Sequence, residues 1–371
     1  MLTQEPMHPS NDPWEAYNDV TKFGENRLTN VEFTTTTLCN MRCEHCAVGY
    51  TLQTEDPEAL PIELLLQRLD EVEHLRALSI TGGEPMLSKT SVNEYVLPLL
   101  KYAAERGVRT QLNSNLTLPF KRYEPILPYL DVLHISHNYG SIEDFQEIGF
   151  AHMENKPSIE QRNKLYHRMF ENTRLMNDAD VLVSAETMLN KRTLPHIAAI
   201  HEQVVKMGCD RHEIHPMYPS DFGSALEVAS LENIRNGIHH LLDERDPNVW
   251  MLFGTLPFYP CNDNEEDLGL LKRMYNEPNL SIRNDPDGNA RLNVNIFNGE
   301  IIVSDFADAP ALGNVQTTTL NEAYKRWHES DAAKHVSCHC PAVECLGPNV
   351  LVKQAYYQNV DFLARSTKIT K

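Results

Sequence analysis

Three cysteines fall within one short run near the start of the chain, Cys39-Asn40-Met41-Arg42-Cys43-Glu44-His45-Cys46. Their spacing, C-x3-C-x2-C, places three thiolates on one loop, and cysteine thiolate is the usual ligand of iron–sulfur clusters. Three ligands hold three corners of a cubic cluster and leave the fourth iron open to a small molecule, as in other open metal sites. The alternative is a zinc site, completed by His45 or by a ligand elsewhere in the chain.

A second group of cysteines is concentrated near the C-terminus. With one cysteine upstream it makes four thiols, enough to close every corner of a second 4Fe–4S cluster. These residues are Cys261, Cys338, Cys340 and Cys345. A structural zinc held by the four cysteines, or by three of them with His335 or His339, is the alternative. Cys209 stands apart from both groups and is expected to be a small buried hydrophobic residue.

The elements that must position these groups follow a regular alternation. From about residue 30, short β-rich runs alternate with amphipathic helices, which is the pattern of βα units around a parallel sheet. The expected strands are Val31–Thr37, Ala77–Thr81, Val108–Asn113, Val132–Ser136, Val181–Thr187 and Glu213–Met217. Six such units are too few for a closed eight-stranded barrel, but they suit an open, partial barrel.

A different pattern follows in the C-terminal third. Leu292–Phe297 and Ile301–Phe306 flank Asn298-Gly299, which is a strong hairpin signal because both turn residues tolerate positive φ. The run Leu312-Gly313-Asn314-Val315 and an expected helix over Leu320–Trp327 come next. The sequence therefore predicts an N-terminal extension over 1–29, a barrel core over 30–245 and a smaller α+β domain over 246–371.

Candidate site residues lie at the carboxyl ends of the expected strands, where βα barrels place their active sites. The cysteine loop leaves the first strand, and Gly82-Gly83-Glu84 follows the second. Paired glycines let the backbone approach a ligand closely. Ser136 ends the fourth strand, and Glu186 lies near the end of the fifth.

The cysteine run, with an aromatic slot filled by His45 just before its last cysteine, resembles the signature of the radical S-adenosylmethionine (SAM) superfamily. That resemblance implies a 4Fe–4S cluster on Cys39, Cys43 and Cys46, whose open iron is chelated by SAM. It also implies reductive cleavage of SAM to a 5′-deoxyadenosyl radical, which takes a hydrogen from the substrate. The implied fold is α/β, a partial (β/α)6 TIM-like barrel.

The same resemblance assigns expected roles to the other candidates. Gly82, Gly83 and Glu84 match the GGE motif, which is implicated in holding the SAM amino group. Ser136 is expected near the SAM carboxylate or ribose, and Glu186 near the ribose hydroxyls, whose donors suit a carboxylate. The candidate catalytic residues are His137 and Tyr139, which occupy substrate-facing positions in relatives and can pass a proton. The run that holds them departs from the Ser-x-Asp-Gly pattern of peptide-modifying relatives, which weakens any transfer of substrate class.

The C-terminal part resembles the SPASM or twitch extension of radical SAM enzymes, and its last motif resembles the radical SAM family named for a CxCxxxxC element. This resemblance implies a small cluster-binding α+β domain with a second 4Fe–4S cluster. The expected substrate is a peptide or protein, with a small metabolite or nucleoside as the alternative. The expected reductant is a protein such as flavodoxin or ferredoxin.

Composition narrows the possible partners and the compartment. The 371 residues carry a net charge of −19, which argues against a nucleic-acid binder that tracks the phosphate backbone. No signal peptide and no apolar run near membrane-spanning length are expected, so the predicted location is cytoplasmic, where cysteines stay reduced. The alternative from another class is a non-catalytic zinc-binding regulatory or metal-handling protein.

Overall fold

A computed structural model of the protein describes residues 17–217, 220–284, 286–304, 310–336, 338, 340 and 345–369. Residues 1–16 of the predicted N-terminal extension, His339 and the last two residues of the second predicted hairpin strand lie outside the described residues. Within those ranges, no helix is both long enough and apolar enough to span a membrane.

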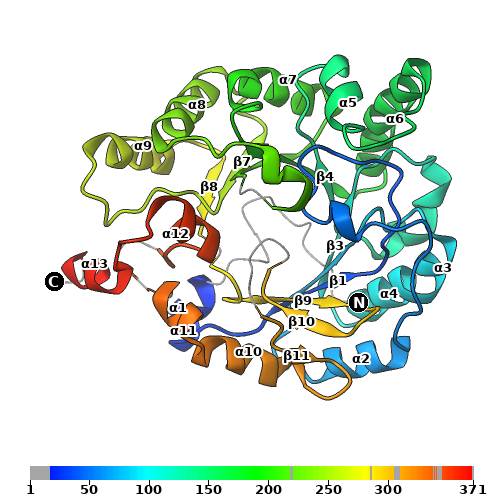
Figure 1. Ribbon diagram of the computed structural model, residues 1–371, viewed down its shortest axis with the longest axis horizontal. Helices are drawn as coiled ribbons and strands as arrows, with labels where there is room; N and C mark the ends of the chain where they lie inside the picture. The colour runs from blue at the N-terminus through cyan, green and yellow to red at the C-terminus, as the bar shows by residue number, and fades with distance from the viewer. Residues whose placement is uncertain are drawn as a thin grey trace.

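All strands join one sheet in the order β11-β10-β9-β1-β2-β3-β4-β5-β6-β7-β8. The strands from β9 through β1 to β8 are parallel, whereas β10 and β11 extend the edge beyond β9 in antiparallel fashion. Their bounds are β1 Asn30–Thr34, β2 Ala77–Thr81, β3 Arg109–Ser114, β4 Val132–Ser136, β5 Leu182–Leu189, β6 Arg211–Pro216, β7 Trp250–Gly254, β8 Leu280–Arg283, β9 Arg291–Asn295, β10 Glu300–Ile302 and β11 Gly313–Asn314. Figure 1 shows the sheet curved into an incomplete barrel with helices on its outside.

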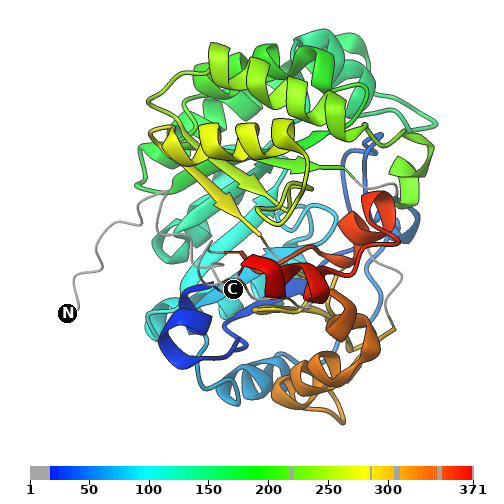
Figure 2. The same cartoon turned by 90° about the vertical axis from the view of Figure 1, so that its left-hand side faces the viewer.

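Helices follow most strands and cover the outer face of the sheet (Figure 1). The α-helices are α1 Tyr17–Phe23, α2 Ile62–Asp70, α3 Lys89–Ser91, α4 Leu97–Glu105, α5 Ile142–Ile148, α6 Ile159–Asn177, α7 Ile197–Met207, α8 Leu231–Glu244, α9 Glu265–Asn276, α10 Leu320–Glu329, α11 Asp331–Val336, α12 Val350–Tyr356 and α13 Phe362–Ile369. Shorter helical turns are η1 Gly49–Thr51, η2 Val92–Val96, η3 Phe120–Arg122, η4 Glu124–Tyr129, η5 Leu194–His196 and η6 Asp221–Ala225. Figures 1 and 2 both place α10 to α13 toward the end of the sheet that β9 to β11 form.

Local sequence explains where the longest helix begins. Ser158 precedes α6, and its hydroxyl accepts a hydrogen bond from the backbone N–H of Gln161. The Gln161 side chain in turn accepts from the Ser158 backbone N–H at 2.9 Å. This capping box satisfies two backbone donors that have no partner inside the helix.

The expected α/β fold with a partial parallel barrel is confirmed, and the six predicted strands correspond to β1 to β6. Two further parallel strands, β7 and β8, continue the sheet beyond residue 245. The predicted hairpin forms β9 and β10, and β9 pairs with β1. The sheet thus runs across the predicted boundary between core and C-terminal domain, and both regions line the interior.

Candidate functional site

The cysteine loop follows β1 directly and is held by its own backbone and by the end of α5. The Arg42 guanidinium donates to the carbonyl oxygens of Cys39 and Met41, at 2.8 Å each. The backbone N–H of Arg42 donates to the carbonyl of Gly149, and the Arg42 carbonyl accepts from the backbone N–H of His152. These bonds fix the loop, so its cysteines are positioned before any ligand binds.

Three thiols of this loop line one cavity of about 350 Å³. Burial raises the pKa of Cys39 to about 12, and burial and the neighbouring thiols raise the pKa of Cys43. Burial also raises the pKa of Cys46. Without metal the thiols are therefore neutral, and metal binding must release their protons. Three buried, unpaired thiols on one cavity wall fit the three protein-held corners of a 4Fe–4S cluster.

The glycines after β2 pack directly against this loop. The backbone N–H of Gly83 donates to the carbonyl of Thr36 at 2.9 Å. A Cβ added at Gly82 would lie 2.5 Å from the Thr36 oxygen, and one added at Gly83 would lie 2.2 Å from the Leu38 oxygen. Both glycines line the cavity. Only residues without a side chain allow the loops after β1 and β2 to meet here.

Glu84 does not line the cavity with its side chain. Its carboxylate is fully buried and accepts from the Ser114 hydroxyl and from the backbone N–H of Asn115 at 2.8 Å. Burial raises the pKa of Glu84 to about 7, although these hydrogen bonds lower it. Its observed contacts tie the loop after β2 to the end of β3.

Ser136, Glu186 and His45 lie together on the cavity wall. Ser136 and Glu186 are paired across β4 and β5. The Ser136 hydroxyl lies 3.4 Å from Nε2 of His45, and the Asn138 amide nitrogen lies 3.1 Å from the same atom. Burial lowers the pKa of His45 to about 4, so the ring is neutral and Nε2 can accept from Asn138.

His137 and Tyr139, the predicted catalytic residues, do not line the cavity, and this expectation is corrected. Side chains alternate between the two faces of a strand, and Ser136 at the end of β4 faces the interior. His137 therefore turns outward and is fully buried, with its ring centroid 5.3 Å from that of Tyr139. The Tyr139 hydroxyl lies 3.9 Å from the Cys43 sulfur, behind the cysteine loop.

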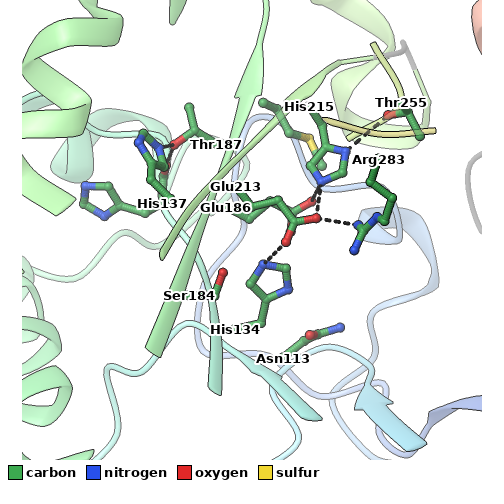
Figure 3. A network of polar contacts seen from close by, with 12 residues as sticks. Asn113, His134, His137, Ser184, Glu186, Thr187, Glu213, His215, Thr255 and Arg283 are labelled. Carbon is green, nitrogen blue, oxygen red and sulfur yellow. Dashed lines mark hydrogen bonds and ion pairs between the residues drawn. The ribbon is translucent and has the colours of Figure 1, made fainter. Parts of the chain in front are cut away.

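A polar network inside the barrel was missed as a site by the sequence analysis. Glu213 on β6 accepts from Arg283 on β8 and bonds His215 Nε2, both at 2.6 Å. Nε2 of His134 lies 3.3 Å from the second carboxylate oxygen of Glu213. The His215 Nδ1 atom lies 3.2 Å from the Thr255 hydroxyl, after β7. Figure 3 shows these side chains pointing toward one another from four neighbouring strands.

The charges in this network support each other. Burial raises the pKa of Glu213, but the charge of Arg283 and the contact with His134 lower it further, so the carboxylate stays ionised. Burial lowers the pKa of His215, but its bond to Glu213 and the charges of Glu213 and Glu186 raise it above the usual value. Polar residues at alternate positions of β6 were the available sequence signal, because they face the same side as the barrel interior.

The C-terminal cysteines converge in a separate apolar cluster. Cys338, Cys340 and Cys345 are buried and Cys261 is partly buried, packed with aromatic residues such as Tyr259. Cys340 and Cys345 form an isolated antiparallel bridge, with backbone N···O distances of 2.9 and 3.3 Å. Burial and the nearby Cys345, Cys340 and Cys261 raise the pKa of Cys338.

Other predicted details of the cysteines have mixed outcomes. Cys209 lies in the hydrophobic core, as predicted. The His335 ring contacts the carbonyl of Asp331 in its own helix. Across the residues that the structure describes, no three His, Cys, Asp or Glu side chains are grouped as a single metal ion would require.

Comparisons of the sequence with protein families give two matches. Residues 33–203 match the radical SAM superfamily, and residues 217–367 match a YfkB-like domain. The chain is 66% identical over 364 residues to the putative protein YfkA of Bacillus subtilis (strain 168), which covers 98% of both chains. Over 56 residues it is 34% identical to the (2S)-3-sulfopropanediol dehydratase activating enzyme of Klebsiella oxytoca, covering 15% of this chain and 16% of that enzyme.

Solved structures share the fold at low sequence identity. Streptococcus suis SuiB bound to S-adenosylmethionine matches with a TM-score of 0.57 and 15% identity, covering 89% of this chain and 75% of that one. The enzyme anSMEcpe with bound AdoMet matches with a TM-score of 0.59 and 14% identity, covering 92% and 95%. These likenesses concern the fold alone.

Proposed function

Because this chain belongs to the radical SAM superfamily and shares a family with the putative protein YfkA, we propose that it binds and reductively cleaves SAM. One observation carries the proposal: the three loop cysteines, Gly82, Gly83, Ser136 and Glu186 line a single cavity. A bound cluster would supply the electron that splits the SAM sulfonium and yields a 5′-deoxyadenosyl radical.

The residues of this chain would bind and orient SAM. Cys39, Cys43 and Cys46 would hold three corners of the cluster and leave the fourth open. The backbone at Gly82 and Gly83 would accept the SAM amino group, because no side chain separates it from the cavity. Ser136 and Glu186, side by side across β4 and β5, would bind the polar groups of the ribose or carboxylate.

We also assign the four C-terminal cysteines to a second 4Fe–4S cluster. Four thiols meet in one apolar cluster, and each of the two most buried, Cys338 and Cys345, is electrostatically coupled to Cys261 and Cys340. The segment that follows them reaches the main cavity through Asn349 and Leu351. The second cluster would therefore lie close enough in the fold to influence the substrate or the electron balance.

The proposed reaction abstracts hydrogen from a peptide, with electrons from a flavodoxin or ferredoxin type of protein. SuiB, which shares the fold, has been solved with its precursor peptide SuiA. A small metabolite or nucleoside is the alternative. Comparing 5′-deoxyadenosine formation in the presence of peptide fractions and of small molecules separates these substrates, and stimulation by small molecules alone would contradict the peptide.

Anaerobic reconstitution with iron and sulfide tests the cofactor assignment. Two clusters predict about eight irons per chain and brown absorption. Cys43→Ala should abolish 5′-deoxyadenosine formation, whereas Cys338→Ala should keep cleavage and lose about four irons. Cys209→Ala is the matched control, because this core thiol is remote from both groups and should keep all the iron. A colourless zinc protein that leaves SAM intact would contradict the proposal.

A further inference from the structure

A buried carboxylate without a cationic partner faces the main cavity. Glu32 lies in the middle of β1 and is 7% exposed. Its side chain lines the same cavity as the cysteine loop that follows β1. One carboxylate oxygen accepts from the Ser79 hydroxyl at 2.8 Å and from the Asn113 amide at 3.3 Å.

Both of these donors are neutral. Among the described residues, no Lys, Arg or His side chain makes an ion pair with Glu32. An ionised carboxylate that is taken out of water costs several kcal/mol, ~2–7 even for a neutral polar group, unless a charge of opposite sign approaches it. The cavity is the open direction from which a cation can come, so Glu32 favours a positively charged ligand group.

The residues next to Glu32 suit a protonated amine in particular. Asn293 is paired with Glu32 across β9 and β1 and also lines the cavity. Its amide oxygen is an acceptor, as is the hydroxyl of Thr34, the next cavity residue along β1. An ammonium group carries three donors, so one carboxylate with neighbouring neutral acceptors matches it.

The opposite charge is found at the network on β6 and β8. Glu213 is a single carboxylate, but Arg283 and His215 both contact it at 2.6 Å, and Arg211 lies at 3.6 Å. Glu186 lies 3.8 Å from His215, so two carboxylates face three basic side chains. This wall therefore carries an excess of positive charge and favours a ligand anion.

We propose that the cavity binds a ligand with a protonated amine at Glu32 and a carboxylate at the wall formed by Arg283 and His215. The ligand class is an amino-acid-like zwitterion, either a free small molecule or a residue of a short peptide. The carbon chain between its two charges would lie in the cavity that the cysteine loop lines. This inference rests on the proposed function, because it names the substrate class of that same site.

Anaerobic isothermal titration of the reconstituted protein tests the proposal with simple probes. The zwitterions are 4-aminobutanoate, 6-aminohexanoate and 8-aminooctanoate, and the single-charge controls are hexylamine and hexanoate. At least one zwitterion should bind at least about tenfold more tightly than both controls. Glu32→Gln should weaken that zwitterion by at least about tenfold, because the amide keeps both hydrogen bonds and loses only the charge.

A matched variant and a fold check guard against trivial loss. Glu105→Gln removes an exposed carboxylate on α4, outside the cavity, and should bind the probes as the wild type does. The circular dichroism and melting temperature of Glu32→Gln should match those of the wild type. Unchanged zwitterion affinity in a folded Glu32→Gln protein would overturn the proposal, as would hexanoate that binds as tightly as the best zwitterion.

Two further probes distinguish the source of the ligand. L-lysine and acetyl-Gly-Gly-Lys carry the same amine and carboxylate at the same separation. Tighter binding of the peptide supports a peptide source, and tighter binding of free lysine supports a small molecule. If wild-type protein cleaves SAM and binds none of the zwitterions, this inference fails and the proposed function stands. Zwitterion binding without SAM cleavage gives the reverse result.

Discussion

Tyr139 acts on the cysteine loop rather than on a substrate. Its hydroxyl lies 3.9 Å from the Cys43 sulfur, and its ring packs edge-on against Phe145. Burial, followed by the charge of the Cys43 thiolate, raises the pKa of Tyr139, so the phenol stays protonated. It can therefore donate to a Cys43 thiolate that binds iron. Hydrogen bonds to the sulfur ligands are among the features that set cluster potentials.

Tyr139→Phe should lower the reduction potential of the loop cluster. The hydroxyl stabilises the extra negative charge of the reduced state, and losing ~1 kcal/mol of that stabilisation lowers a one-electron potential by about 40 mV. A redox titration followed by electron paramagnetic resonance measures the shift. Tyr95→Phe is the control, because its hydroxyl bonds the Leu60 carbonyl and should leave the potential unchanged. Equal potentials in wild type and Tyr139→Phe would rule out the hydrogen bond.

At the scale of elements, the close contact of two loops builds the cofactor cradle. The loop after β1 carries the thiols, and Gly82 and Gly83 after β2 press against it through backbone hydrogen bonds. Glu84 then connects the second loop to the end of β3. Three consecutive strands therefore position the cysteines through contacts between their carboxyl ends.

Gly83→Ala should damage this cradle. The added methyl would lie 2.2 Å from the backbone oxygen of Leu38, so the two loops must separate. We expect the free energy of unfolding to fall by about 1–3 kcal/mol and SAM affinity to decrease. Gly269→Ala is the matched control, because this exposed glycine in α9 has open space around it and alanine should add up to ~1 kcal/mol. Urea denaturation and equilibrium SAM binding measure both effects, and normal SAM affinity in Gly83→Ala would count against the cradle.

A buried histidine pair joins α7 to β6 and β5. The Asp246 backbone N–H donates to Nε2 of His201, so His201 carries its proton on Nδ1 and donates to Nδ1 of His212 at 2.9 Å. Nε2 of His212 then donates to the Thr187 hydroxyl at 2.8 Å. This single ordering of protons keeps both rings neutral, and burial lowers the pKa of His201 to about 4.

Acid should therefore destabilise the protein through His201. A folded pKa of about 4 against a usual 6.5 means that the unfolded chain binds the proton more readily. The stabilising contribution is present above pH ~6.5 and is lost as the pH falls toward 4, with a limit of about 3 kcal/mol. The unfolding free energy of His201→Gln should change less over this range than that of the wild type. His240→Gln, an exposed site on α8, should keep the wild-type slope, and a wild-type slope in His201→Gln would exclude the effect.

Local signals in the sequence predicted the elements and the cysteine loop, but not the wall of the cavity. The cysteine loop and the glycines after β2 are contiguous motifs, so their place was predictable. Glu213 and Arg283 belong to distant strands and meet only through the curvature of the sheet. Half-buried β8 is only four residues long and gave no periodic signal. His137 was misplaced because one residue beyond Ser136 reverses the direction of the side chain.

At the scale of the whole molecule, the two ends of the sheet come from neighbouring parts of the chain. Strands β8 and β9 are consecutive in sequence, yet β9 pairs with β1 while β8 lies at the far edge. The core that contains Val31 and Phe33 of β1 also contains Leu292 and Val294 of β9. Residues after 245 supply Arg283 and Asn293 to the same cavity as the cysteine loop. The C-terminal region therefore completes both the core and the site.

Residues 30–245 should not fold alone. Without β9, the parallel edge of β1 and the apolar side chains packed on it would be exposed, and β6 would lose β7. Full-length protein should unfold in urea as one cooperative transition, whereas the fragment should show none. Co-expression with residues 246–371 should restore the transition, because the missing strands can pair in trans. A fragment that unfolds cooperatively by itself, with helical circular dichroism, would show that residue 245 is a true domain boundary after all.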